Sequence, residues 1–153
     1  ENCKYIISLL FPIHTNLGGN LIGPTVLSRA LVSGGLAGLI GMMNGVAICQ
    51  KANISLDHFK DIYIRRINSM IGKESKRIIE AIVSEDTKST EASISAWGHG
   101  QEALLSISKT LDANLDFQLA LNSLFKQAVK AGVEDHDLSA MVKIFKMNKQ
   151  SNE

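Results

Sequence analysis

One uninterrupted apolar stretch constrains the fold of this chain more than any other feature. Between Arg29 and Lys51 there is no charged residue. Pro24 suits the first turn of a helix, and nothing interrupts a helix from about residue 25 to about residue 52. At about 1.5 Å per residue such a helix is on the order of 40 Å long. The sequence therefore predicts one helix that spans the whole domain.

The rest of the chain carries apolar residues at helical spacing, and it contains only two prolines. The candidate N-caps are Ser55, Thr90 and either Asp135 or Asp137, while Gly132 suits a left-handed turn at a helix end. This pattern predicts an all-α fold, a bundle of helices around the long central one. The expected helices cover about 55–69, 73–84, 91–113, 116–131 and 135–147.

Residues 1–23 are expected to belong to a different domain from the helices that follow. A helix is expected over 2–16, and Gly18-Gly19 then stops it. Residues 20–22 form a short extended piece with no partner strand elsewhere in the chain. We therefore expect a sheet in a part of the protein outside this chain. The predicted organisation is the end of a preceding domain over 1–23, a helical domain over 24–147 and a disordered tail over 148–153.

The uncharged stretch is also long enough for a membrane span, which needs about 20 apolar residues. It contains Gly34-x-x-x-Gly38 and Gly41-x-x-x-Gly45, a spacing at which membrane helices dimerise. A helix buried in a soluble core is the preferred interpretation, because the other helices are amphipathic and need a surface to cover. Asn44, near the middle of the stretch, also disfavours a lone span. A membrane-anchored helical protein stays as an alternative.

The glycines of this helix need a physical reason. Each costs roughly 1 kcal/mol relative to alanine, so together they cost on the order of 5 kcal/mol, comparable to the stability of a small domain. The available compensation is close approach of a backbone, a bulky side chain or a ligand to the bare helix. The sequence predicts a packed interface or a binding surface along Gly34, Gly35, Gly38, Gly41 and Gly45.

Charge and cysteine content exclude several classes of protein. The net charge is +1 without a basic stripe, which argues against nucleic-acid binding. Cys3 and Cys49 match no metal or redox spacing and are expected as free thiols in a reducing compartment. The four histidines share no metal-ligand spacing, so no metal site is expected. No signal peptide is visible, so we expect the protein in the cytoplasm.

No motif defines an active site by its spacing. The segment from Gly98 to Ala103 matches the loose G-x-G-x-x-G/A dinucleotide pattern, but that fingerprint needs a buried strand before it. Ser93 and Ser95 would be unsuited to such a strand, so a helix loosened by two glycines is the preferred interpretation. Glu134 and its neighbouring aspartates are interpreted as helix capping rather than catalysis.

Three segments together resemble a known family. The stretch 30–48, ALVSGGLAGLIGMMNGVAI, resembles the interdomain helix of NADPH-dependent imine reductases and reductive aminases. These enzymes belong to the β-hydroxyacid dehydrogenase and 6-phosphogluconate dehydrogenase superfamily. Residues 17–23 resemble the end of that family's dinucleotide domain, and 121–132 with 135–140 resemble its closing helices.

The resemblance implies an architecture and a chemistry. It implies the C-terminal helical domain of an oxidoreductase in which a Rossmann domain holds NADP. Two chains would intertwine as a homodimer, each helical domain closing over the partner's cofactor. The substrate would be a small imine or carbonyl compound, with no membrane or nucleic acid as partner. A chain without the Rossmann domain is not expected to hold NADP tightly or to be active alone.

The resemblance also suggests site residues. Many relatives place a catalytic lysine or aspartate where this chain has Ser28, and others use a tyrosine where it has Leu36. A serine hydroxyl is a poor proton donor by comparison. Gly35 and Leu36 would line the substrate pocket, and Trp97 and His99 would face the partner's pocket. Because neither proton donor is present, a catalytically inactive helical dimerisation domain of the same fold stays as the alternative function.

Overall fold

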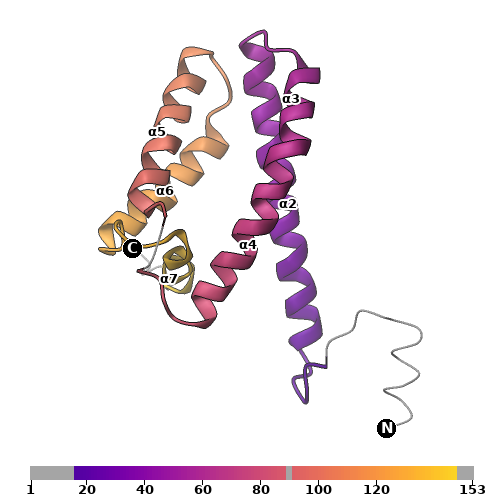
Figure 1. The fold of residues 1–153 in the computed structure, drawn as a ribbon, viewed down its shortest axis with the longest axis vertical. Coiled ribbons are helices and arrows are strands. Elements are labelled where there is room, and N and C mark those ends of the chain that lie inside the picture. Colours follow the sequence, from indigo (N-terminus) through magenta and orange to yellow (C-terminus); the bar gives the residue numbers. More distant parts are fainter. Residues whose placement is uncertain (1–15, 89–90, 148–153) are drawn as a thin grey trace, which may run out of the picture. The chain divides into compact units, whose positions relative to one another are not determined.

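All the regular secondary structure in the computed structural model is helical within its described residues, 16–88 and 91–147 (Figure 1). The chain divides into two compact units, Glu1–Ile40 and Gly41–Glu153, which are described separately. The predicted all-α class is confirmed. The elements are α2 (Gly23–Lys51), α3 (Leu56–Ile62), a π-helix (Tyr63–Ile67), α4 (Asn68–Val83), α5 (Ile94–Thr110), α6 (Asp116–Lys130), a 3₁₀ helix (Leu138–Ala140) and α7 (Met141–Lys146).

The long helix predicted from about residue 25 to 52 is confirmed as α2, which has 29 residues. A turn precedes it, in which Gly23 N–H donates to the backbone oxygen of Asn20 at 3.2 Å and to its Oδ1 at 3.0 Å. The extended piece predicted over 20–22 is therefore wrong, because the asparagine side chain closes a turn there instead. The helix predicted over 2–16 and the tail predicted over 148–153 fall on residues that the structure does not describe, apart from Asn16.

Within the second unit, the part of α2 that follows Ile40 is only partly covered by other helices. Ile48 is the buried residue of this helix, and its side chains from residue 24 to residue 40 are all exposed. The expectation that the chain's own helices bury α2 on all sides is therefore wrong, because between Gly41 and Lys51 only Ile48 is buried and Met43 is 55% exposed. Within the second unit, α3 and α6 supply the contacts to α2, through Phe59 and Phe117.

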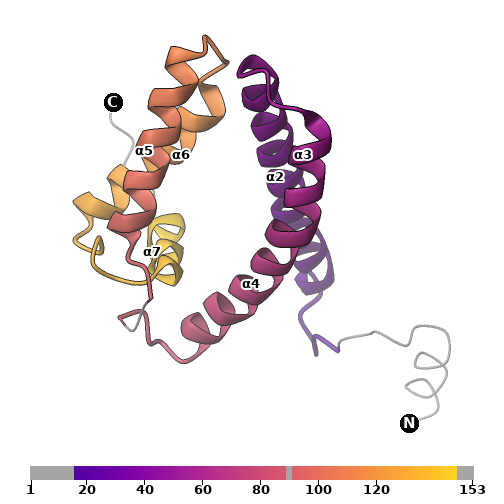
Figure 2. The ribbon, with the colours of Figure 1, turned by 45° about the horizontal axis from the view of Figure 1, so that its top comes forward.

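Helices α3 and α4 run on from one another through the π-helix, as Figure 2 shows. Ser55 is the N-cap, as predicted, because its hydroxyl oxygen accepts from Asp57 N–H at 3.3 Å. The predicted interruption between Ser69 and Lys73 is absent, since the i→i+5 bonding of the π-helix keeps the backbone amides bonded. Gly72 lies within α4.

The best-buried core of the described residues lies where α5, α6 and α7 meet. It contains Ile94, Ala128 and Ile144, with Phe125 packed against them. The segment before the 3₁₀ helix lies along the start of α5, because Ile94 N–H donates to His136 O at 2.9 Å. Gly132 has a φ of 67°, which confirms the predicted left-handed turn after α6.

Two predicted caps are resolved by this packing. Ser93 caps α5, because its hydroxyl oxygen accepts from Ala96 N–H at 3.3 Å. The helix begins at Ile94, so the prediction that Thr90 caps a helix from about residue 91 is wrong about where the helix begins. Thr90 itself is outside the described residues. Asp137, and not Asp135, is the second cap, and its Oδ1 accepts from Ser139 N–H at 2.8 Å. Pairing of Ser93 with Asp137 fixes both caps at one place in the fold.

Replacing Ile94 by alanine should remove much of this core. Because the side chain is fully buried, Ile94→Ala should lower the free energy of unfolding by about 3 kcal/mol. Ile107→Ala is the matched control, since Ile107 is on the same helix and exposed; it should cost less than about 1 kcal/mol. Urea unfolding followed by circular dichroism measures both, and equal losses would contradict the assignment of the core.

Candidate functional site

Three of the predicted site residues lie on the exposed half of α2. Gly35 and Leu36 follow Ser28 by seven and eight residues, which is about two helical turns. The three residues therefore lie on neighbouring parts of one surface. Leu36 is 54% exposed, and a Cβ added at Gly35 would meet nothing within 4 Å. This part of α2 therefore offers an open, mostly apolar surface that carries the Ser28 hydroxyl near its start.

The other two predicted site residues lie on α5, in the second unit. They are two positions apart, which places them on different faces of the helix. His99 lines a small cavity of about 100 Å³, together with Glu102 and Lys126. Trp97 is 39% exposed and does not line that cavity. The structure therefore does not bring Trp97 and His99 into one pocket within this chain, and their substrate contacts stay a prediction.

Four glycines of α2 form a stripe along one face, because they follow each other at intervals of four, three and four residues. At Gly41 an added Cβ would lie 3.3 Å from Phe117 Cζ, and at Gly45 it would lie 3.4 Å from Phe59 Cε2. At Gly34 and Gly38 it would meet nothing within 4 Å. Phenylalanine rings of the same chain thus account for the second pair of glycines and leave the first pair unexplained.

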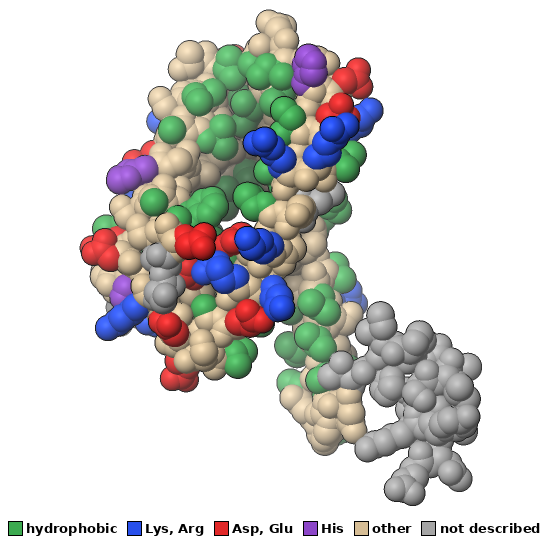
Figure 3. Space-filling view, in the orientation of Figure 1, with side chains coloured by type: hydrophobic (Ala, Val, Ile, Leu, Met, Phe, Trp, Pro, Cys, Tyr) green, Lys and Arg blue, Asp and Glu red, His purple; other side chains and the backbone are tan. Residues whose placement is uncertain are grey.

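Exposed apolar side chains surround the bare glycines. Figure 3 shows hydrophobic side chains along the length of α2 that precedes residue 41. Within the described residues, α2 is also the helix whose length and composition would suffice to cross a membrane. Its exposed large side chains before Gly41 are Val26, Leu27, Leu31, Val32, Leu36, Leu39 and Ile40.

A row of side-chain amides fixes α2 against the bundle between the two phenylalanine contacts. Gln118 of α6 is 2% exposed, and its Nε2 donates to Asn44 Oδ1. Gln101 of α5 in turn donates through its Nε2 to Gln118 Oε1. The sequence identified Asn44 as unusual for an apolar helix but did not identify its partners. A buried amide bonded on both sides favours one rotational setting of the helix over others.

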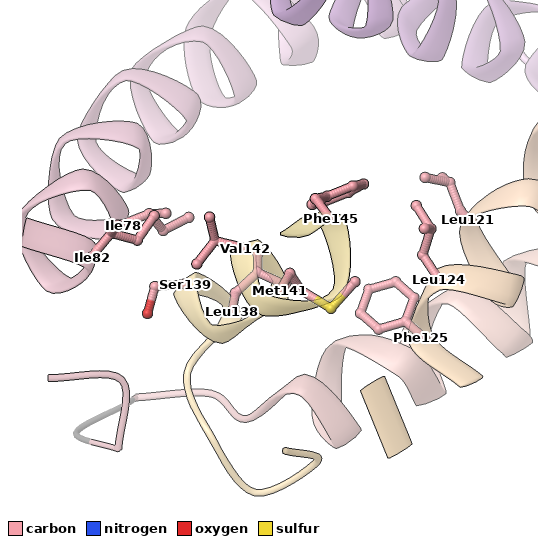
Figure 4. Close-up of a pocket in the computed structure, with 10 residues that line it drawn as sticks. All are labelled: Ile78, Ile82, Leu121, Leu124, Phe125, Leu138, Ser139, Met141, Val142 and Phe145. Carbon is pink, nitrogen blue, oxygen red and sulfur yellow. The ribbon is translucent and has the colours of Figure 1, made fainter. Parts of the chain in front are cut away.

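An apolar groove lies between α4 on one side and α6 on the other, as Figure 4 shows, with a volume of about 440 Å³. The 3₁₀ helix and α7 lie between these walls. Helical spacing in the sequence places Ile78, Ile82, Leu121, Leu124 and Phe125, half of the lining residues, on inward faces, but it gave no sign that they leave a space. The groove is lined by Ile78, Ile82, Leu121, Leu124, Phe125, Leu138, Ser139, Met141, Val142 and Phe145.

The described residues contain no cluster of three or more His, Cys, Asp or Glu side chains that could hold a metal ion. Gly98 and Gly100 lie inside α5 rather than in a loop between a strand and a helix. The interpretation of this motif as part of a helix is confirmed, and the described residues offer no phosphate-binding loop of the dinucleotide type. Cys49 is a free thiol, as predicted.

Solved structures share this fold although their sequences differ widely. An imine reductase from Pseudomonas sp. superposes on 94% of this chain with a TM-score of 0.77 and 21% identity. An imine reductase from Myxococcus stipitatus in complex with NADP+ covers 86% of the chain at a TM-score of 0.80 and 19% identity. A reductive aminase from Aspergillus terreus, in complex with NADPH4, cyclohexanone and allyl amine, covers 79% at a TM-score of 0.72 and 19% identity.

The predicted resemblance to imine reductases and reductive aminases is confirmed in the fold. The chain spans about half the length of these structures, since it covers 50%, 49% and 42% of them respectively. No protein-family model and no curated protein sequence matches the chain.

The amide row gives a prediction for stability. Gln118→Leu should lower the free energy of unfolding by about 2 kcal/mol, because the side chains of Asn44 and Gln101 lose their partner in a mostly buried place. Gln127→Leu is the control on the same helix, where the glutamine is exposed, and should change stability by less than about 0.5 kcal/mol. Thermal and urea unfolding would show the difference, and indistinguishable variants would refute the role given to Gln118.

Proposed function

We propose that this chain is the dimerisation and substrate-pocket part of an NADP-dependent oxidoreductase that reduces a C=N bond, or a C=O bond. The observation that carries the proposal is the match in fold, over nearly the whole chain, to imine reductases and a reductive aminase. The low sequence identity leaves the reaction to be argued from the chain's own residues.

A second copy of this chain would cover the exposed half of α2. Bare glycines at Gly34, Gly35 and Gly38 carry a cost of roughly 1 kcal/mol each in a helix, and only close approach of other atoms offsets it. Phe117 and Phe59 give that approach to the later glycines within one chain. Exposed leucines beside the earlier glycines would supply the apolar area for a stable homodimer.

The dinucleotide would bind mainly to another domain of such an enzyme. The described residues of this chain provide no phosphate-binding loop, so they do not fit NADP by themselves and no step of hydride transfer is assigned to them. Their proposed work is to bind and orient the substrate and to exclude water. Gly35 and Leu36 would form one wall, while Trp97 and His99 would contribute from the helical domain of the partner.

Proton delivery is the chemical question that the sequence raises. Ser28 lies on the exposed half of α2, at the position of the lysine or aspartate of the relatives, and its hydroxyl is a weak acid at neutral pH. A substrate that arrives as a cationic iminium needs less proton donation than a neutral imine. We therefore propose iminium-type substrates ahead of carbonyl compounds.

The second candidate function is a helical dimerisation domain of the same fold without catalysis. The resemblance supports it, because it aligns Ser28 and Leu36 of this chain with both proton donors of the relatives. Under this alternative the protein would form the dimer but would not oxidise NADPH.

The proposed setting is the cytoplasm, with neither a membrane nor nucleic acid as partner. A net charge of +1 gives no electrostatic footprint for nucleic acid. The membrane-anchored alternative requires lipid rather than protein on the exposed half of α2. Recovery of the full-length protein in the soluble fraction without detergent would argue against it.

The dimer can be tested at one glycine. Gly38→Leu in the full-length protein should raise the dimer dissociation constant at least tenfold, because the new side chain occupies the space that a second copy's atoms would fill. Gly72→Leu on α4 is the matched control, since an added Cβ there also meets nothing within 4 Å of the same chain. Sedimentation velocity over a concentration series gives both constants. A monomeric parent protein, or an unchanged dimer dissociation constant for Gly38→Leu, would refute the proposed dimer.

Catalysis can be tested at Ser28. The full-length protein should oxidise NADPH when cyclic imines are added, and Ser28→Asp should speed the reaction of a neutral imine at least tenfold, since a positioned acid contributes about 10²–10⁴-fold. An N-alkylated cyclic iminium is the control substrate, because it needs no proton and its rate should change by less than about twofold. Absorbance at the NADPH band follows both. No oxidation by either protein with either substrate would favour the inactive alternative.

A further inference from the structure

The two walls of the apolar groove, α4 and α6, differ in how firmly they are packed against the rest of the bundle. Helix α6 belongs to the best-buried core with α5 and α7. Helix α4 follows the π-helix at its start, and of the elements that come after it the 3₁₀ helix is the main one it contacts. Ile79 and Val83 of α4 are exposed, and Ile78 and Ile82 are only half-buried where they line the groove, so apolar packing of this helix is incomplete. A directional polar contact can supply what this packing leaves open in the position of α4.

One ion pair joins α4 to the segment below the groove. Arg77 Nη1 donates to Asp137 Oδ2 at 2.7 Å, across 60 residues of sequence. The Asp137 side chain is 0% exposed, whereas that of Arg77 is 34% exposed. The other carboxylate oxygen accepts from Ser139 N–H, and the backbone N–H of Asp137 donates to Thr87 O at 2.9 Å. The carboxylate is therefore held rigidly by its own segment before it accepts Arg77.

The guanidinium is oriented on its own side as well. Glu74, one turn earlier on α4, accepts from Arg77 Nε at 2.9 Å, and the same Oε2 atom lies 2.9 Å from Arg77 Nη2 in an ion pair. These bonds, followed by those to Asp137, raise the pKa of Arg77, so the guanidinium stays charged. A planar group fixed by one carboxylate and bound to another has little freedom to follow a shift of the helix.

Each member of the pair is next in sequence to a residue that lines the groove. Arg77 precedes Ile78, which lines the α4 side. Asp137 precedes Leu138, which lines the groove from the 3₁₀ helix between the two walls. A change in the separation of the pair must therefore change the separation of these two lining residues.

Burial of a charged pair is weak evidence for added stability, because the loss of hydration offsets much of the attraction. Its directional bonds instead favour a single arrangement of the two elements that carry it. We infer that the Arg77–Asp137 pair is a latch that sets the position of α4 against the 3₁₀ helix and so fixes the width of the apolar groove. This inference does not depend on the proposed function.

Hydrogen exchange in the full-length protein tests the latch. Arg77→Met should speed amide exchange in residues 74–83 at least tenfold, while peptides from the core of α5 and α6 change less than twofold. Lys76→Met is the matched control on α4, because Lys76 is exposed and pairs only with Glu80 among the described ion pairs. It should leave both rates unchanged. Equal acceleration in all peptides of Arg77→Met, or none in α4, would overturn the latch.

A double variant separates positioning from stability. Arg77→Met leaves the buried carboxylate without its guanidinium partner, and adding Asp137→Asn removes that charge while the side-chain oxygen can still cap Ser139. The double variant should recover thermal stability relative to Arg77→Met and keep the fast exchange of α4. Recovery of slow exchange in α4 would mean that the pair does not position the helix.

A conservative variant covers the case in which Arg77→Met does not fold. Arg77→Lys keeps the positive charge but lacks the planar fork that binds Glu74 and Asp137 together. It should fold and show at least threefold faster exchange in α4 than the parent protein. Exchange at the parent's rate would show that charge alone suffices and would overturn the latch as a geometric device.

Discussion

The structure depends on how one uncharged helix is covered along its length. Between Arg29 and Lys51 there is no charge, and glycines remove side chains from one face of α2. In its second half, phenylalanine rings from α3 and α6 lie against Gly45 and Gly41. At Gly34, Gly35 and Gly38 no atom of the described residues lies within 4 Å of an added Cβ. Because each glycine lowers helix propensity, the proposed second copy would supply the compensating contacts there.

Polar contacts define the arrangement of this bundle more than its apolar core does. The core of α5, α6 and α7 is modest in size, and many large apolar side chains remain exposed. Gln118 fixes the setting of α2 through Asn44, and Asp137 fixes that of α4 through Arg77. Directional bonds select one geometry where loosely packed apolar surfaces would allow several.

Periodicity and capping chemistry predicted most of the helices but not every boundary. The length of α2, the cap at Ser55 and the turn at Gly132 are local features, which single residues encode. The sequence predicted an N-cap at Thr90, whereas Ser93 caps α5. The difference arises because pairing with the chain around Asp137 decides where α5 begins. The π-helix after α3 also carries no sequence signal of its own. Contacts between distant segments set these boundaries, and a local pattern cannot encode them.

The candidate site was predicted residue by residue from a resemblance, whereas its surroundings came from the structure. Ser28 and Leu36 could be named because the glycines that follow Ser28 fix the alignment. The groove beside α4 could not be foreseen, because inward-facing residues such as Ile78 and Phe125 normally fill the space between helices. An apolar hollow in one chain has a cost, since its lining loses contacts that close packing would give. That cost falls when other atoms enter the groove. The groove and the bare glycines of α2 are alike in this respect, because atoms of another protein or a ligand would restore the missing contacts at either surface.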